Sequence, residues 1–492
     1  MTNTTGTRLV RPSLPEYLTQ INDRALGLRL LSVNECHADG GTKGSMGRLV
    51  IISNRVARIE EGKSTSGGLA VGVLDALRAQ GGLWFGWDGE IAEQPPKTPH
   101  LTVHGPLTYA TFPLSPEDYD AYYGQYANRV LWPLLHGRAD LVEHANAAFQ
   151  GYTRVNRDFA AKLLPLLQPD DIIWVHDYHL FPLGEELRRG GATQRIGFFL
   201  HIPFPTLDTL RILPEYRRLV EAIKAYDLIG FQTQADLEAF REASDHYGEG
   251  ARLGVFPIGV DTGRIAEIAE TAAQTPTVAR MKESLAAGDL IVGVDRLDYT
   301  KGLERRFESY AGFLESYPEF QGRVTFLQIA PPTRGHLPEY RSLRRRLSTL
   351  AGEIAGRFSQ PDWTPIRYIN RNFARRTLLG FFRASQVALV TPLRDGMNLV
   401  AKEFVASQAP DDPGVLVLSA FAGAAQELDG ALIVNPYDPD AMAEALREAL
   451  RMPLEERQAR WRPMLETLQR QDVTAWREAF VASLTQVNRK VA

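Results

Sequence analysis

The chain has 492 residues, which is enough for two large domains or three of ordinary size. Its 44% of hydrophobic and 23% of charged residues are typical of a soluble globular protein, and a net charge of −4 gives no basic bias toward nucleic acid. The single cysteine, Cys36, excludes an internal disulfide framework and a cysteine-based zinc cluster. No apolar run approaches the length of a membrane span, and the N-terminus lacks the apolar core of a signal peptide, so we expect a cytoplasmic protein.

Residues 1–45 differ in character from the rest of the chain. They are polar and end in a glycine-rich run at Ala38–Ser45, and a strong strand pattern follows directly after Met46. We expect residues 1–45 to form a disordered or loosely docked extension, or to precede the true start of the protein.

From Met46 onward, strand and helix patterns alternate in two successive series. The first series predicts helices at Leu69–Ala79, Ala147–Leu167 and Gln234–Glu242, and strands at Leu49–Ile52, Ile172–Val175, Ile196–Leu200, Leu228–Phe231 and Gly254–Pro257. A charged, alanine-rich helix at Ile265–Ala287 leads to a second series, with strands at Leu290–Val294, Val324–Ile329, Ile366–Tyr368, Val387–Val390, Val415–Leu418 and Leu432–Val434. Two such series indicate an α/β protein with two doubly wound, Rossmann-like parallel-sheet domains facing each other across a cleft. We place these domains at residues 46–260 and 261–465, followed by a helical segment at 466–492 that could pack back on the first domain.

The stretch Thr391–Val405 combines a strand end, a polar loop and a helix start. Asn398 is suited to cap a helix that begins near Leu399, and the first N–H groups of a helix lack intrahelical partners, so they can bind an anion. Asp395 on the loop and Glu403 one turn into the helix would suit a ligand with a phosphate between two sets of hydroxyl groups. An ordinary crossover whose charges face solvent is the alternative.

Polar clusters also follow two strands of the first series. His176 and Asp177 follow one strand, and His201 follows the next, at the strand ends where open α/β sheets bind ligands. Successive strand residues point to opposite faces, which argues against chelation of one metal ion by His176 and Asp177 and favours hydroxyl binding by Asp177 and His201. The acidic Asp118–Asp120 segment does not directly follow a strand, and we interpret its carboxylates as surface charges.

Other candidate residues point to a phosphorylated ligand. Gly67 and Gly68 precede a predicted helix, where glycine lets the backbone approach a ligand closely, although the pair alone is a weak signal and favours a structural turn. The fragment Gly62–Ser64 is not a P-loop, because Ala57 stands where that motif requires glycine. Tyr123 and Trp132 stand on a predicted helix where core packing is the alternative to binding. The cations near strand ends, where solvated turns are the alternative, are Arg55, Arg296, Lys301 and Arg334.

Many motifs, in order, resemble those of the trehalose-6-phosphate synthase family, retaining glycosyltransferases of family 20 with the GT-B fold. The resemblance extends from about Arg48 to the C-terminus and includes RLVIISNRVA, SGGLAVG, GGLWFGWDGE, YYGQYANRVLWP, DDIIWVHDYHL, RIGFFLHIPFP, DLIGFQT, RLDYTKGL, IAPPTRG, TPLRDGMNLVAKEF and ALIVNPYD. It implies glucose transfer from UDP-glucose to glucose 6-phosphate, giving α,α-trehalose 6-phosphate and UDP. It also implies front-side transfer without an enzyme nucleophile, no cofactor, no required metal ion, and a dimer or tetramer.

The resemblance further implies roles for individual residues. Arg55, Tyr123, Trp132, Asp177 and Arg334 match the glucose-6-phosphate site. The residues expected to act in catalysis are Asp177, His201, Arg296 and Lys301. Those matching the UDP-glucose site are Gly67, Gly68, His201, Arg296, Lys301, Phe373, Asp395, Gly396, Met397, Asn398, Leu399, Val400, Ala401, Lys402 and Glu403. A relative with another acceptor, or a silent sugar-phosphate sensor, is the alternative that the intact residue set disfavours.

Overall fold

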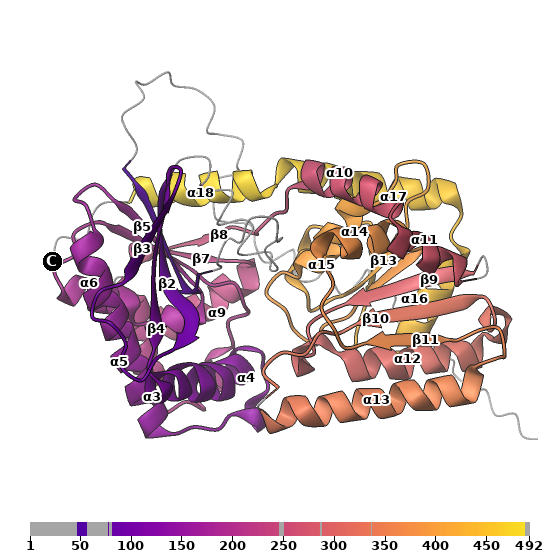
Figure 1. Ribbon diagram of the computed structural model, residues 1–492, viewed down its shortest axis with the longest axis horizontal. Coiled ribbons are helices and arrows are strands. Elements are labelled where there is room, and N and C mark those ends of the chain that lie inside the picture. Colours follow the sequence, from indigo (N-terminus) through magenta and orange to yellow (C-terminus); the bar gives the residue numbers. More distant parts are fainter. Residues whose placement is uncertain are drawn as a thin grey trace, which may run out of the picture. The chain divides into compact units, whose positions relative to one another are not determined.

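The computed structural model describes residues 47–56, 77, 81–245, 250–285, 288–335 and 337–487 (Figure 1). The predicted extension at 1–45 and the predicted helix Leu69–Ala79, apart from Leu77, lie outside the described residues. Across the described part of the chain, no helix combines the length and the apolar character that a membrane crossing requires.

The first sheet has eight strands in the order β3-β4-β2-β1-β5-β6-β7-β8. All neighbouring strands are parallel except β3 and β4, which form an antiparallel edge. The inner strands β1, β5, β6 and β7 are almost wholly apolar because helices and chain segments cover both faces. The strand bounds are β1 Leu49–Arg55, β2 Gly82–Ile91, β3 His100–His104, β4 Leu107–Leu114, β5 Ile172–His176, β6 Arg195–Phe199, β7 Leu228–Phe231 and β8 Arg252–Val255.

The second sheet has six strands, all parallel, in the order β11-β10-β9-β12-β13-β14. Its strands are β9 Asp289–Val294, β10 Val324–Ile329, β11 Ile366–Ile369, β12 Val387–Val390, β13 Val415–Ser419 and β14 Leu432–Val434. In Figure 1, α12 and α13 lie along one side of this sheet and α10, α14 and α15 along the other. The two sheets confirm the predicted pair of doubly wound α/β units.

The helices of the first unit are α3 Pro116–Asp118, η2 Tyr119–Leu131, α4 Trp132–Leu135, α5 Asn146–Leu163, η5 Tyr178–Leu180, α6 Leu183–Arg189, α7 Leu207–Leu210, α8 Tyr216–Ile223 and α9 Gln234–Ser244, with short 3₁₀ turns at Ala139–Leu141 and Leu164–Leu166. Those that follow are α10 Thr262–Ala273, α11 Pro276–Glu283, η7 Tyr299–Lys301, α12 Leu303–Ser316, α13 Pro338–Phe358, α14 Arg375–Arg383, α15 Leu399–Ser407, α16 Pro439–Arg451, α17 Leu454–Arg470 and α18 Val473–Thr485, with 3₁₀ turns at Pro318–Phe320 and Gly423–Gln426.

The prediction of one helix over Ile265–Ala287 is wrong. The chain forms α10 and α11 instead, separated at Gln274 and Thr275, because Pro276 has no N–H with which to continue the helix and fits best in a first turn. The predicted helix Ala147–Leu167 likewise ends at Leu163, and a 3₁₀ turn containing Pro165 replaces its last turn.

The last helix, α18, returns to the first sheet. Phe480 of α18 stacks on Trp174 of β5 at 4.5 Å between ring centroids. A Cβ on Gly197 of β6 or Gly230 of β7 would collide with the same phenyl ring, so these two glycines make room for it. The chain therefore passes between the two units twice, once at residues 256–261 and once at Gln471–Asp472. These two crossings touch, because a side chain on Gly259 would overlap the backbone of Gln471 and Asp472.

Candidate active site

The ends of β1, β5 and β6 bring three predicted residues to one edge of the first sheet. Arg55 is the last residue of β1, Asp177 follows β5, and His201 follows β6 by one residue. The N–H of Asp177 donates to the Phe199 carbonyl at 2.8 Å, and the N–H of His201 donates to Oδ1 of Asp177 at 3.3 Å. Parallel strands end at the same edge, which is why residues distant in sequence meet here.

Asp177 is poised close to neutral pH. Burial raises the pKa of its carboxyl to about 6, although hydrogen bonds from the backbone and the charges of Arg296 and Arg334 oppose the shift. At pH 7 the group is therefore mostly ionised, and it can accept hydrogen bonds from the hydroxyl groups of a ligand.

Arg55 lies over a cluster of aromatic side chains. Its guanidinium is 5.7 Å from the ring centroid of Trp87, and Trp87 in turn packs against Tyr119 and Tyr123 at 5.7 Å. Tyr123 also stacks on His179 at 5.9 Å with an interplanar angle of 14°. Trp87 was not among the predicted residues. It lies in the motif GGLWFGWDGE, but the strand that carries it, β2, was not predicted either.

Tyr123 and Trp132 reach the same loop because η2 is a π-helix of 13 residues. In the helix predicted from the sequence, if it were an α-helix, residues nine apart would lie on opposite faces. The i→i+5 hydrogen bonds of a π-helix widen the turn, and Tyr123 packs on His179 while Trp132 packs on Tyr178 at 5.8 Å. π-Helical turns are rare and frequently occur at functional sites.

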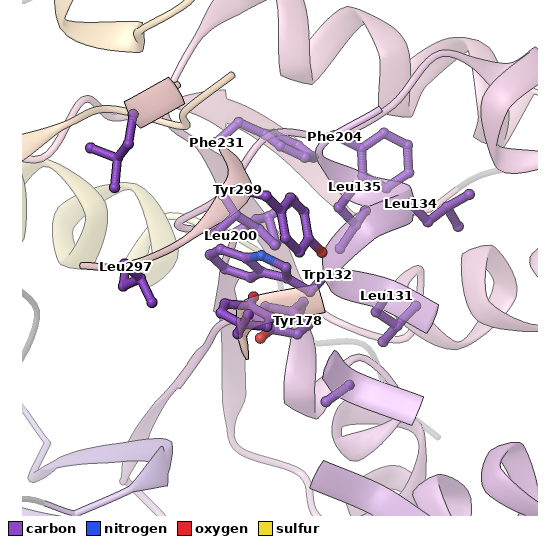
Figure 2. Close-up of a cluster of buried hydrophobic side chains, with 14 of the residues drawn as sticks. Leu131, Trp132, Leu134, Leu135, Tyr178, Leu200, Phe204, Phe231, Leu297 and Tyr299 are labelled. Carbon is purple, nitrogen blue, oxygen red and sulfur yellow. The ribbon is translucent and has the colours of Figure 1, made fainter. Parts of the chain in front are cut away.

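Trp132 is one of the residues at which the two units meet. Its indole, only 4% exposed, lies among Tyr178, Leu200 and Tyr299 in the cluster of Figure 2. The guanidinium of Arg334 is 4.1 Å and that of Arg296 is 5.6 Å from its ring centroid. Arg334 thus stacks closely on a residue of the first unit, although it follows β10 of the second.

Asp298 connects these groups, although the sequence analysis did not single it out. Its side chain is fully buried and accepts from Nη1 of Arg334 at 3.1 Å, from the Tyr340 hydroxyl at 3.2 Å and from Nε1 of Trp132 at 3.4 Å. Burial acts to raise the pKa of this carboxyl, but Arg334 and Arg296 outweigh burial and hold it below the usual value. Asp298 is therefore ionised, and it stands between Arg296 and Lys301 in the motif RLDYTKGL.

The loop after β12 lies against the first unit. Nζ of Lys301 contacts Oδ2 of Asp395 at 2.5 Å, and Nδ2 of Asn398 donates to the same oxygen at 3.0 Å. A side chain on Gly396 would overlap the carbonyl oxygen of His201, so only glycine permits this close approach. Asn398 caps α15, as predicted, by accepting from the N–H of Ala401 at 3.2 Å.

The residues of the predicted donor helix face in different directions. Glu403 accepts from Nε and Nη2 of Arg375 at 3.1 and 2.8 Å, and burial raises the pKa of its carboxyl. Lys402 is fully buried, and its Nζ contacts Glu427 at 2.5 Å and the carbonyl of Ile258 at 2.8 Å. Lys402 therefore directs its side chain at the linker between the units and not at the start of α15. Of the other predicted positions, Met397 and Ala401 are buried, whereas Leu399, Val400 and Phe373 are half-buried.

In the described part of the chain, left-handed backbone at non-glycine residues is confined to this site. Among the described non-glycine residues, positive φ angles occur at Asp177 (77°), Arg334 (47°) and Asn398 (80°). Such conformations persist only where the surrounding structure enforces them, and they cluster at active sites. All three residues were predicted from the sequence as ligand-binding.

Two further sequence predictions remain. Gly67 and Gly68 are outside the described residues. Asp118 pairs with Arg154 at 2.7 Å and Asp120 accepts from Gln125 at 2.6 Å, which agrees with surface charges. Within the described ranges, no group of three or more histidine, cysteine, aspartate or glutamate side chains is arranged to hold a metal ion.

Known proteins with the same arrangement are readily found. The trehalose-6-phosphate synthase of Cronobacter sakazakii is 50% identical over 456 residues, which cover 90% of this chain and 96% of that protein. An α,α-trehalose-phosphate synthase (UDP-forming) from Burkholderia vietnamiensis has a crystal structure that superposes with a TM-score of 0.88 at 51% identity, covering 90% of this chain and 99% of that one.

Two solved structures carry ligands. The synthase from Burkholderia xenovorans in complex with glucose 6-phosphate matches with a TM-score of 0.87 at 50% identity, over 89% of this chain and all of that one. The Escherichia coli protein bound with UDP-2-fluoroglucose matches with a TM-score of 0.85 at 48% identity, over 90% of this chain and all of that one. The model of glycosyltransferase family 20 matches residues 48–486, and the chain belongs to this family.

Proposed function

We propose that the protein is a trehalose-6-phosphate synthase, a retaining glycosyltransferase with the GT-B fold. It transfers glucose from UDP-glucose to glucose 6-phosphate and forms α,α-trehalose 6-phosphate and UDP. Relatives at about 50% identity carry this name over nearly their whole length, and two solved relatives hold glucose 6-phosphate and an analogue of UDP-glucose.

The observation that carries the proposal is the convergence on Trp132. Arg334, which we assign to the acceptor phosphate, and Arg296, which we assign to the donor diphosphate, both lie over this one indole. The positive charges of both arginines act to lower the pKa of the Asp177 carboxyl. The cations for two phosphorylated substrates thus flank one carboxylate, as transfer between a nucleotide sugar and a sugar phosphate requires.

In the proposed mechanism, the protein positions and stabilises charge rather than supplying a nucleophile. The bond from C1 of the donor glucose to the phosphate oxygen breaks, the acceptor oxygen bonds to C1 on the same face, and a diphosphate oxygen takes the acceptor proton. Arg296, Lys301 and the N-terminus of α15 stabilise the departing diphosphate. Asp177 and His201 orient sugar hydroxyl groups. Asp395 and Glu403 bind donor hydroxyl groups.

The remaining assignments belong to the same proposal. Arg55, Tyr123 and Trp132 bind glucose 6-phosphate, and Phe373, Gly67 and Gly68 contact UDP. Residues 46–260 form the acceptor domain, 261–465 the nucleotide-sugar domain and 466–492 the C-terminal helical segment. We further propose metal-independent turnover, an assembly of two or four copies, and a cytoplasmic location.

The test is nucleotide release by the purified protein from UDP-, ADP- and GDP-glucose, with and without glucose 6-phosphate, in parallel with and without EDTA. We expect UDP release that requires glucose 6-phosphate, is unchanged by EDTA and yields a non-reducing disaccharide phosphate. Release only with a different acceptor would reassign the acceptor, and tight UDP-glucose binding without release would point to a sensor.

A further inference from the structure

Two histidines, His176 and His201, form a hydrogen-bonded pair at the edge of the active site. Nδ1 of His176 is 3.0 Å from Nε2 of His201, and their rings stack at 5.2 Å between centroids. His176 is fully buried, whereas His201 is half-buried. His176 takes no part in the mechanism above, yet it is the side chain that holds one of the two ring nitrogens of His201.

Both rings are neutral at pH 7. Burial lowers the pKa of His201 to about 3 and lowers that of His176 well below its usual value. Each neutral imidazole has one N–H donor and one acceptor nitrogen, so a single proton lies between the two rings. The hydrogen bond therefore has two forms. Either His176 donates from Nδ1 and His201 carries its proton on Nδ1, or His201 donates from Nε2 and His176 carries its proton on Nε2.

The surroundings of His176 distinguish the two forms. Its Nε2 is buried and has no hydrogen-bond partner among the described residues. The rings of Trp174 and Trp476 lie 4.6 and 6.3 Å away, and their buried Nε1–H groups also lack acceptors. A proton on Nε2 of His176 would add a third buried N–H without an acceptor to this aromatic cluster, whereas a lone pair there adds no further unpaired donor.

We infer that His176 carries its proton on Nδ1 and donates it to Nε2 of His201, so that His201 carries its own proton on Nδ1. Nδ1 of His201 makes no hydrogen bond within the described part of the chain and is not among its buried unpaired atoms, so it reaches solvent. His176 is thus a positioning residue that presents an N–H of His201 as a hydrogen-bond donor. Its partner must be an oxygen with a free lone pair.

This step rests on the proposed function: the oxygen that accepts from Nδ1 of His201 belongs to the donor sugar. His201 lies directly against Gly396 of the loop assigned to UDP-glucose. His176 therefore affects binding of the glucose part of the donor and not of its nucleotide part. Removal of the orienting bond leaves the proton of His201 free to occupy either nitrogen.

The tautomer is tested directly by ¹⁵N NMR of the whole protein labelled with [¹⁵N]histidine. Ten histidines contribute signals, and those of His201 are identified by their loss in His201→Gln. We expect a protonated Nδ1 and an unprotonated Nε2 for His201. The reverse pattern would overturn the inference, and this measurement needs neither substrate nor turnover.

The functional consequence is tested by comparing His176→Leu with His176→Asn, because the asparagine amide keeps an N–H near the position of Nδ1. We expect His176→Leu to lower kcat/KM for UDP-glucose about tenfold, the usual effect of one lost hydrogen bond, and to leave the affinity for UDP and the KM for glucose 6-phosphate unchanged. His176→Asn should recover most of the loss.

Each other outcome has a distinct meaning. Equal weakening of UDP and UDP-glucose binding in both variants would show a merely structural role and overturn the positioning role of His176. The expected tautomer together with unchanged use of UDP-glucose would leave the proton assignment standing and overturn the sugar contact.

Discussion

Arg296 and Lys301 carry the charge that the proposed reaction needs at its leaving group. We expect Arg296→Ala or Lys301→Ala to lower kcat at least about a hundredfold, because each removes an electrostatic stabiliser of the transition state. Steady-state UDP release measures this. Arg305→Ala is the matched control, since its side chain is half-exposed and, among the described residues, its one ion pair is with Glu308, at 3.8 Å. Near-normal turnover in both active-site variants would refute the leaving-group assignment.

Arg334 is predicted to act on the acceptor alone. Removing its guanidinium in Arg334→Ala takes the cation from the proposed phosphate site, so we expect a higher KM for glucose 6-phosphate and little change in that for UDP-glucose. Asp298→Asn should act in the same direction, because Asp298 holds both Arg334 and Trp132. A rise in the UDP-glucose requirement alone would contradict the assignment.

The raised pKa of Asp177 predicts that both activity and stability depend on pH. Its pKa of about 6 means that kcat/KM should fall as the pH drops below 6, where the carboxylate becomes protonated. Because folding raises this pKa, the ionised group reduces stability at pH values above 6, and this cost disappears below the unfolded value near 4. Asp177→Asn should therefore be nearly inactive yet melt at a higher temperature at pH 7, with no such gain at pH 4. A lower melting temperature at pH 7 would show that the carboxylate is needed for the fold.

At the scale of elements, glycines on two helices have opposite effects. A Cβ on Gly151 of α5 would overlap the Cβ of Ala121 in the π-helix η2, whereas a Cβ on Gly352 of α13 would meet nothing within 4 Å. We expect Gly151→Ala to destabilise the protein by about 1–3 kcal/mol and to raise the KM for glucose 6-phosphate, since η2 carries Tyr123. Gly352→Ala should instead stabilise by about 0.5–1 kcal/mol. Urea unfolding of both variants measures the difference, and an equal response would remove the packing argument.

The elements also show what the sequence could reveal. Strands such as Val387–Val390 were predicted with their observed bounds, because a strand covered on both faces is a continuous apolar run. The strands β2 to β4 were missed because glycine and charged residues interrupt β2, and because β3, at the sheet edge, is largely exposed. Pattern alone also gave no sign that η2 is a π-helix, since that geometry arises from tertiary packing.

The site shows a similar division. Residues such as Asp177 and Asn398 could be named because they follow recognisable strands, and the family motifs supplied others such as Tyr123. Asp298, Trp87 and His176 act through other side chains. Their roles depend on which groups meet in space, and neither spacing nor residue type reveals such contacts.

At the scale of the whole molecule, two adjacent chain crossings link the units. Gly259 in the first crossing packs against Gln471 and Asp472 in the second, and Lys402 of α15 holds the carbonyl of Ile258 beside them. Motion between the units should therefore turn about this point. We expect Gly259→Val to push the crossings apart and to lower kcat. The secondary structure of both sheets should be unchanged in this variant. Circular dichroism beside kinetics separates these effects, and unchanged kcat would remove the hinge from this position.

The return of α18 to the first sheet also has a consequence for protein synthesis. Phe480 packs on Trp174 and on the surface left by Gly197 of β6 and Gly230 of β7. The ribosome adds Phe480 more than two hundred residues after β7. During translation the early part of the chain therefore emerges with an uncovered aromatic surface, and it can complete its core only when the last helix is released. Nascent chains stalled before α18 should depend on chaperones and resist proteases poorly, whereas those that include α18 should become resistant in a single step.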